Sequence, residues 1–277
     1  GENIHCSRRL RLDGKRCRRE GGKEYVVWKE RGRERRMEIP DWFKKNNPQY
    51  ESGLVSHILL AARMGMRGEA VGAEYLQWAA RRQIGAGAQF LDVNIDEVSS
   101  DLQERLGCMA WIVPVIQKAA GAIPLSLDSS HPETLRRGLG AYDFSLGTPM
   151  LNSVALERLE MLEVAGERKL PSIVMASSER GMPHTARERL DNLRRIIGLC
   201  LQKGLPPGHL YVDVLIFPLS SNPGEAKESL EAMRKVREEH GPEIHVAGGH
   251  SNFSYGMPLR TLLNAVWLDL AIERGCD

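Results

Sequence analysis

Six carboxylate and amide side chains stand where apolar, strand-like runs of the sequence end. The polar residues are Asp92, Asn94, Asp128, Asn152, Asp213 and Asn252. Asp and Asn disfavour strands, and a helical pattern follows each run, so these groups should lie along one edge of a parallel sheet. In a barrel, that edge is where ligands bind. The pattern therefore predicts a ligand-binding site at this edge.

Strand-like and helical segments alternate along most of the chain. The predicted strands are a short one at Ile4, then Phe90–Val93, Pro124–Leu127, Met150–Leu151, Ser172–Met175, Tyr211–Leu215 and Ile244–Ala247. The predicted helices are Ala70–Ile84, Cys108–Ala119, Pro132–Leu139, Leu156–Glu167, Ala186–Gln202, Glu225–Glu239 and Leu259–Arg274. We expect an α/β fold, a (β/α)8 TIM-type barrel whose last strand is missing from this chain. A doubly wound sheet is the alternative, but it would place its ligand at one switch point.

The length and composition of the chain limit which class of protein it can be. A chain of 277 residues with 42% hydrophobic and 27% charged residues suits one globular domain spanning residues 1–277. It has neither an apolar stretch long enough to cross a membrane nor an apolar secretory segment, so a cytoplasmic protein with no membrane partner is expected. The five cysteines form no C-x-x-C pair, which argues for reduced thiols over disulfides or a zinc knuckle.

A basic segment interrupts the repeat. Between Arg8 and Arg36 there are thirteen Lys or Arg residues against five Asp or Glu residues, while the whole chain has a net charge of only +2. Turn signals flank Tyr25–Trp28, so residues 8–50 are interpreted as an inserted loop or hairpin region. It is either a solvated loop or a docking surface for an acidic partner or a phosphate group. It carries no nucleic-acid-binding motif, so no nucleic acid is expected.

The sequence gives little support for a metal site or for a nucleotide-binding site. His245 and His250 are five residues apart across a strand end and a loop, and the sequence holds no H-E-x-x-H pattern and no Cys/His cluster. We predict no metal site, and we interpret His250 as a hydrogen-bonded loop residue. The pair Gly248-Gly249 lacks the lysine and the spacing of a P-loop.

Six blocks of sequence occur in an order that resembles the pterin-binding family. They are GENI (1–4), GAQFLDVN (87–94), PLSLDSS (124–130), LNS (151–153), YVDVLIFPLS (211–220) and GHSNFSYGMP (249–258). Within that family the chain looks most like the methyltetrahydrofolate:corrinoid-protein methyltransferases. The resemblance covers most of the chain outside the basic segment.

The resemblance implies roles for individual residues. Asp128, Asn152 and Asp213 match the family's pterin contacts, and a carboxylate can accept from the ring N3–H and the 2-amino group together. Asn252, with Ser251, matches the active-site Ser-Asn pair, where an amide can donate to N5 without titrating. Asp92, Asn94 and Asn3 would form the polar floor of the site. From the residues alone, Asp128 could instead cap the helix near Pro132, and Asn252 could be a turn residue.

The implied activity is methyl transfer between N5 of tetrahydrofolate, with 5-methyltetrahydrofolate as the methylated form, and cobalt, in either direction. No D-x-H-x-x-G motif is present, so cobalamin is expected on a separate corrinoid protein, and the family also implies a homodimer. The segment Ile95-Asp96-Glu97 departs from the family, which usually has a glycine there. The alternatives are a dihydropteroate synthase, although the acidic 96–101 segment would repel diphosphate, and a non-catalytic pterin- or corrinoid-binding subunit.

Overall fold

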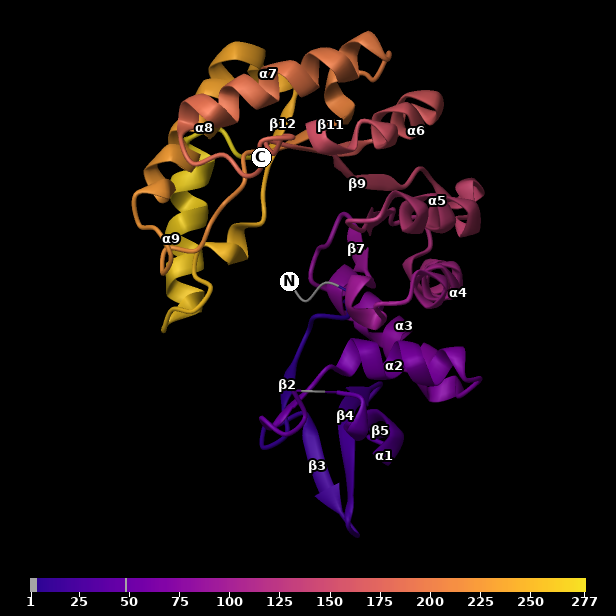
Figure 1. Ribbon diagram of the computed structural model, residues 1–277. Helices are drawn as coiled ribbons and strands as arrows, with labels where there is room; N and C mark the ends of the chain where they lie inside the picture. Colours follow the sequence, from indigo (N-terminus) through magenta and orange to yellow (C-terminus); the bar gives the residue numbers. More distant parts are fainter. Residues whose placement is uncertain (1–3, 48) are drawn as a thin grey trace. The chain divides into compact units, whose positions relative to one another are not determined.

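The computed structural model describes residues 4–47 and 49–277. The chain divides into two compact units, Gly1–Pro149 and Met150–Asp277. Both units are built from parallel strands that alternate with helices (Figure 1). The α/β class with a parallel sheet is therefore confirmed. Whether residues 1–277 act as one domain stays a prediction.

Three short parallel strands form the sheet of the N-terminal unit, in the order β1-β7-β8. They are β1 (Ile4–His5), β7 (Leu91–Asn94) and β8 (Leu125–Asp128). The helices are α2 (His57–Met66), α3 (Ala70–Gly85), α4 (Leu102–Ala120) and α5 (Pro132–Ala141), with 3-10 turns at Asp96–Val98 and Phe144–Leu146. Gly72 lets α3 cross close to α2, because a Cβ there would lie 2.2 Å from the carbonyl oxygen of Ala61.

The basic segment folds into strands of its own. A three-stranded antiparallel sheet contains β3 (Cys17–Glu20), β4 (Lys23–Glu30) and β5 (Arg33–Glu38), followed by α1 (Asp41–Lys45), while β2 (Leu10–Arg11) pairs with β6 (Leu54–Val55). Trp28 is buried, and its ring lies 4.9 Å from that of Tyr75 on α3. The indole N–H of Trp78 donates to the carbonyl oxygen of Lys29 at 2.9 Å. The segment is thus a sheet anchored on α3, more than the loop or single hairpin expected.

The C-terminal unit repeats one strand–helix pattern four times. Its parallel strands, in the order β9-β10-β11-β12, are β9 (Met150–Val154), β10 (Ser172–Met175), β11 (Leu210–Asp213) and β12 (His245–Ala247). Its helices are α6 (Glu160–Arg168), α7 (Ala186–Gln202), α8 (Glu225–His240) and α9 (Arg260–Glu273), with 3-10 turns at Leu156–Arg158, Pro207–His209, Gly241–Glu243 and His250–Asn252. A capping box formed by Thr185 and Glu188 fixes the start of α7.

The strands have one buried face and one half-buried face. The alternate residues Leu91 and Val93 of β7 are fully buried, as are Leu210 and Val212 of β11, whereas the polar residues between and after them are only half-buried. All five cysteines are free, as expected, and the structure also buries them. Among the described residues, no helix is both long enough and apolar enough to span a membrane.

Candidate functional site

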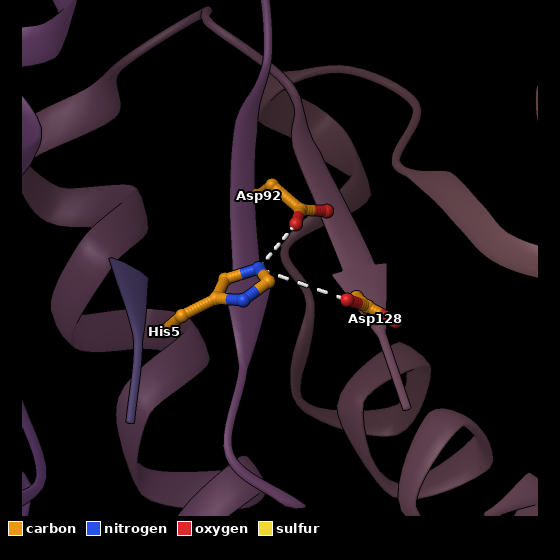
Figure 2. A group of neighbouring side chains, drawn as sticks. All are labelled: His5, Asp92 and Asp128. Carbon is orange, nitrogen blue, oxygen red and sulfur yellow. Dashed lines mark hydrogen bonds and ion pairs between the residues drawn. The ribbon is translucent and has the colours of Figure 1, made fainter. Parts of the chain in front are cut away.

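A row of polar side chains crosses the sheet of the N-terminal unit at its carboxyl edge. His5 on β1 pairs in register with Asn94 on β7, and Asn94 pairs with Asp128 on β8. Asp92 lies two residues before Asn94, and therefore points to the same face of β7. Figure 2 shows the side chains of Asp92 and Asp128 converging on the imidazole of His5. The structure thus brings together Asp92, Asn94 and Asp128, as predicted, and adds His5.

His5 is tied to both carboxylates. Its Nε2 lies 2.5 Å from Oδ2 of Asp92 and 3.6 Å from Oδ2 of Asp128. The side chain of Asn94 hydrogen-bonds to Asp128, and its Oδ1 accepts from the backbone N–H of Asp96 at 3.0 Å. Sequence reasoning missed His5, although it obeys the same rule as the others, a polar residue at the end of a strand. Asn3, the residue predicted for that strand, lies outside the described residues.

The electrostatic setting of Asp128 favours its neutral form. Burial, followed by the nearby charge of Asp92, raises the pKa of Asp128 from 3.8 to about 7, while His5 and Asn94 act in the opposite direction. A carboxyl group with such a pKa is poised between its two protonation states near neutral pH. A ligand that donates hydrogen bonds to it would favour the ionised form.

Asp96, in the segment Ile95-Asp96-Glu97, connects two loops at the carboxyl edge of the sheet. Its carboxylate accepts from the Ser129 hydroxyl at 2.5 Å, and from the Ser130 backbone N–H and hydroxyl at 2.8 Å each. It therefore ties the loop after β7 to the loop after β8. The alternative in which Asp128 caps α5 is wrong, because the N-cap of α5 is His131 and no side chain caps it. Asp128 is left to face the site.

The same row could hold a cation. One ligand atom each from His5, Asp92 and Asp128 lies within 4.8 Å of the others, a set suited to a divalent metal. A cation there would use the Asp128 oxygen that a hydrogen-bonding ligand needs. The two uses of Asp128 compete, and the absence of a metal stays a prediction.

Asp128→Asn is expected to stabilise the folded protein at high pH. The folded-state pKa of Asp128 lies above its unfolded value, so its contribution to stability is fully present below about pH 4 and is lost as the pH rises through about 7. An asparagine side chain does not ionise, so the variant does not lose stability in this way as the pH rises. The variant should exceed the wild type by about 1–2 kcal/mol in unfolding free energy at pH 8, with a smaller difference at pH 4.5. Urea unfolding at both pH values measures this, and equal gains at both would contradict it.

In the C-terminal unit, Asp213 ends β11 and is held by backbone groups. Its Oδ1 accepts from the N–H of Leu215 at 2.8 Å, and the backbone of Gly249 donates to it as well. Burial raises the pKa of Asp213 from 3.8 to about 6, against these two hydrogen bonds. Gly248 permits the close approach, because a Cβ there would lie 2.8 Å from Cδ1 of Ile216 and 3.3 Å from the Asp213 carboxylate.

Asp213 and Asn252 line one cavity of about 400 Å³. Leu215, Phe217 and Tyr255 contribute to its walls. Asn252 ends a 3-10 turn and is exposed, and its backbone N–H donates to the Gly249 carbonyl at 2.8 Å. Its backbone thus does form a turn, as the alternative reading proposed, while its amide remains available to a ligand in the cavity. The structure thus places these two residues on one cavity.

The remaining predicted residues are placed as follows. Asn152 is half-buried in β9, and the peptide bond that follows it is cis. Ser251 is exposed, and its carbonyl oxygen accepts from Arg260 at 2.9 Å. His250 accepts from the Trp267 indole at 3.0 Å and contacts the Cys276 thiol at 3.2 Å, which confirms the interpretation of a hydrogen-bonded loop histidine.

Sequence reasoning also missed Arg189, a fully buried cation beside the Asp213 loop. Its Nε donates to the carbonyl oxygen of Val214 at 2.9 Å, and its Nη2 lies 3.3 Å from Glu225. Its guanidinium also lies 5.4 Å from the ring of Phe217. Arg189 therefore fixes the loop that carries part of the cavity wall. Its position on the buried face of α7, next to Leu190, was the available signal.

Comparison with known proteins identifies the family of this chain. A family model described as pterin binding enzyme matches residues 73–277, more than half of the chain. The chain belongs to this family. All the predicted site residues except Asn3 lie within the matched range, whereas His5 and the basic segment precede it.

Individual proteins are similar to this chain at low sequence identity. A methylcorrinoid:tetrahydrofolate methyltransferase from Eubacterium limosum is 25% identical over 203 residues, which cover 70% of this chain and 71% of that protein. A dihydropteroate synthase of Xanthomonas albilineans in complex with 7,8-dihydropteroate matches with a TM-score of 0.58 at 20% identity, over 74% of this chain and 77% of that one. The synthase of Stenotrophomonas maltophilia gives 0.56 at 19% identity, covering 74% and 80%. The two structures share the fold of this chain.

Proposed function

We propose that this pterin binding enzyme transfers a methyl group between N5 of tetrahydrofolate and the cobalt of a separate corrinoid protein. The supporting observation is the cavity that Asp213 and Asn252 share, since one residue suits the pterin edge and the other suits N5. The distant methyltransferase relative supports the same reaction. The proposal also includes a (β/α)8 TIM-type barrel and a homodimer.

The pterin edge is assigned to carboxylates. Its N3–H and 2-amino group are adjacent donors, which one ionised carboxylate can accept in two parallel hydrogen bonds. Asp213 and Asp128 are the candidates, with pKa values raised to about 6 and about 7. Asn152 would complete the ring contacts as both donor and acceptor, and Asp92 and Asn94 would support Asp128.

Asn252 is assigned to N5. When the Co(I) lone pair attacks the methyl carbon, the bond from carbon to N5 breaks and its electron pair stays on N5, which then takes a proton. A hydrogen bond from the Asn252 amide strengthens as this electron density develops. In the reverse direction, N5 attacks the methyl group on cobalt and loses its proton. Ser251 would help to orient the loop that holds Asn252.

Dihydropteroate synthesis is less well supported, although its enzymes share the fold. That reaction needs a site for diphosphate. In this chain the loop after β7 carries the carboxylates of Asp96, Glu97 and Asp101, of which Asp96 binds the β8 loop and Asp101 caps α4. This loop would repel diphosphate, as the sequence indicated.

The basic segment is expected to speed the encounter with the corrinoid protein. Arg18, Arg31 and Arg33 are exposed on the β3-β4-β5 sheet, so replacing all three with Ser should lower the transfer rate several-fold at low salt and weaken its dependence on ionic strength. Arg16 is unsuitable because it contacts Tyr75 and Trp78. Rates measured between low and high salt test this. A rate and a salt dependence equal to those of the wild type would leave the segment without this role.

Calorimetry with tetrahydrofolate tests the assignment of the substrate. We expect binding of one folate per chain, unchanged by a metal chelator because the site is predicted to need no cation. Asn152→Ala should weaken this binding by about 1 kcal/mol, the scale of one neutral hydrogen bond. A protein that is folded but binds no folate would exclude the proposed function.

A further inference from the structure

A small cavity lies between the β3-β4-β5 sheet and α3 in the N-terminal unit. Its volume is about 210 Å³, and we call it the tryptophan pocket because Trp28 and Trp78 both line it. None of the residues assigned to folate lines this pocket, and its whole lining belongs to the N-terminal unit. The lining also includes the carboxylate of Glu34 and five cationic side chains, which are Lys15, Arg16, Arg18, Lys29 and Arg82.

Trp28 adds an unsatisfied donor to the lining of the tryptophan pocket. This residue is only 4% exposed, and its indole N–H has no hydrogen-bond partner within the described residues. Trp78 differs, because its indole N–H donates to the carbonyl oxygen of Lys29. An indole N–H can donate but cannot accept, and leaving it buried without a partner is unfavourable. A ligand that brings an acceptor to Trp28 would therefore gain affinity.

Arg16 is held in position at the tryptophan pocket. Its Nη2 donates to the hydroxyl group of Tyr75, whose oxygen lies 2.9 Å from Nδ1 of the buried His57. Burial, followed by the charge of Arg16, lowers the pKa of His57 from 6.5 to about 3, so the imidazole is neutral near neutral pH. The guanidinium of Arg16 also lies 5.3 Å from the centre of the Trp78 ring. A guanidinium fixed in this way loses little conformational freedom when it binds an anion.

The exposed cations of the tryptophan pocket are only partly balanced by negative charge. Lys15 and Arg18 form no ion pair among the described residues, and Arg18 donates to the carbonyl oxygens of Lys15 and Cys17. Lys29 on β4 is in register with Glu34 on β5, so this carboxylate offsets part of the positive charge. The lining keeps an excess of cations, and a cavity lined mainly by one sign of charge attracts the opposite sign.

We propose that the tryptophan pocket binds a small phosphate monoester, as a second ligand site separate from the methyl-transfer site. A phosphate monoester has a charge of about −1.5 to −2 at neutral pH, and its oxygens accept hydrogen bonds. They can accept bidentate pairs from a guanidinium and single bonds from an ammonium group or an indole N–H, which are the donors of this pocket. The indole rings and Val27 provide an apolar wall for a small organic group.

Calorimetry with phenyl phosphate tests this proposal. Wild-type protein is expected to bind one phenyl phosphate per chain, more weakly at high salt and more tightly than it binds inorganic phosphate. The variants Lys15→Gln and Arg18→Gln change exposed residues and should each lower the affinity by about 3- to 10-fold. Arg33→Gln is the matched control, because Arg33 is exposed on β5 but does not line the pocket, and it should keep the full affinity.

Trp28→Phe tests the contribution of the indole N–H. Phenylalanine keeps an aromatic ring but has no N–H, so the variant should lose affinity for phenyl phosphate while its circular dichroism spectrum stays that of the wild type. If Trp28→Phe does not fold, the two variants of exposed residues still decide the matter.

Three results would overturn the proposal. The first is no binding of phenyl phosphate, or an affinity no higher than that for inorganic phosphate. The second is an equal loss of affinity in Arg33→Gln, which would indicate general attraction to the basic sheet. The third is tighter binding of a phosphoserine peptide, which would assign the pocket to a phosphorylated protein. These measurements use neither folate nor a corrinoid protein, so they stand or fall independently of the proposed methyl transfer.

Discussion

Asn252→Ala is expected to slow methyl transfer by about 10²–10³ while changing folate affinity by far less. The amide donates to N5 most strongly in the transition state, so its loss raises the barrier more than it weakens the bound complex. Asn252 is exposed at the rim of the cavity, and its removal leaves the buried core of the C-terminal unit intact. Single-turnover rates and folate affinities, measured on the same preparation, give the two effects separately.

The matched control for this variant is Asn222→Ala. Asn222 lies in the loop after β11, its side chain bonds to Glu225, and it does not line the cavity. It should keep nearly the full transfer rate. A proportional loss of binding and rate in Asn252→Ala would make Asn252 a ground-state contact. Loss of neither would make it only the residue that shapes the turn.

Asp128→Asn and Asp213→Asn should each weaken folate binding by about 1.5–3 kcal/mol, the scale of one charge-assisted set of hydrogen bonds. An amide presents only one acceptor oxygen to two donors of the pterin edge, and its own N–H groups oppose the ring donors. Calorimetry at pH 8, where both wild-type carboxyl groups are ionised, gives the cleanest comparison. Unchanged affinity in both variants would remove the pterin assignment.

The pH dependence of folate binding by the wild-type protein tests the same assignment of Asp128 and Asp213 to the pterin edge. The pterin binds the ionised carboxylates, so affinity should be highest above pH 7 and fall as the pH drops through about 7 and then about 6. Below those values, each carboxyl group must release a proton on binding, which costs about 10-fold in affinity per pH unit. Each Asn variant should lose one of the two steps. A flat profile in the wild type would contradict the assignment of both roles.

Much of the fold could be predicted from the local pattern of apolar and polar residues. The bounds of β10 and α7 agree with the residue pattern because Ser172–Met175 is a compact apolar run and because Thr185 and Glu188 mark where α7 begins. Helix α2 was not predicted. It lies directly after the basic segment, and its residues HILLAARMGM are too uniformly apolar and too short to show a clear helical stripe.

The candidate site was predictable in part for the same reason. Asn94, Asp128 and Asp213 each end a strand, Asp92 lies two residues before the end of β7, and strand ends are visible in sequence. His5 ends a strand of only two residues, which gives almost no signal. The support given by Arg189 depends on its packing against a loop 25 residues away in the sequence. Such long-range contacts leave no local pattern.

The most direct test of the proposed methyl transfer is the absorption spectrum of cobalt. Methyltetrahydrofolate, a corrinoid protein whose cobalt is reduced to Co(I) and the purified protein are mixed without oxygen. The predicted result is loss of the Co(I) spectrum and appearance of the methylcobalt spectrum, with one tetrahydrofolate formed per methyl group, much faster than without the protein. A protein that binds methyltetrahydrofolate yet leaves the cobalt spectrum unchanged, and does not demethylate the methylated corrinoid protein with tetrahydrofolate, would contradict the proposed function.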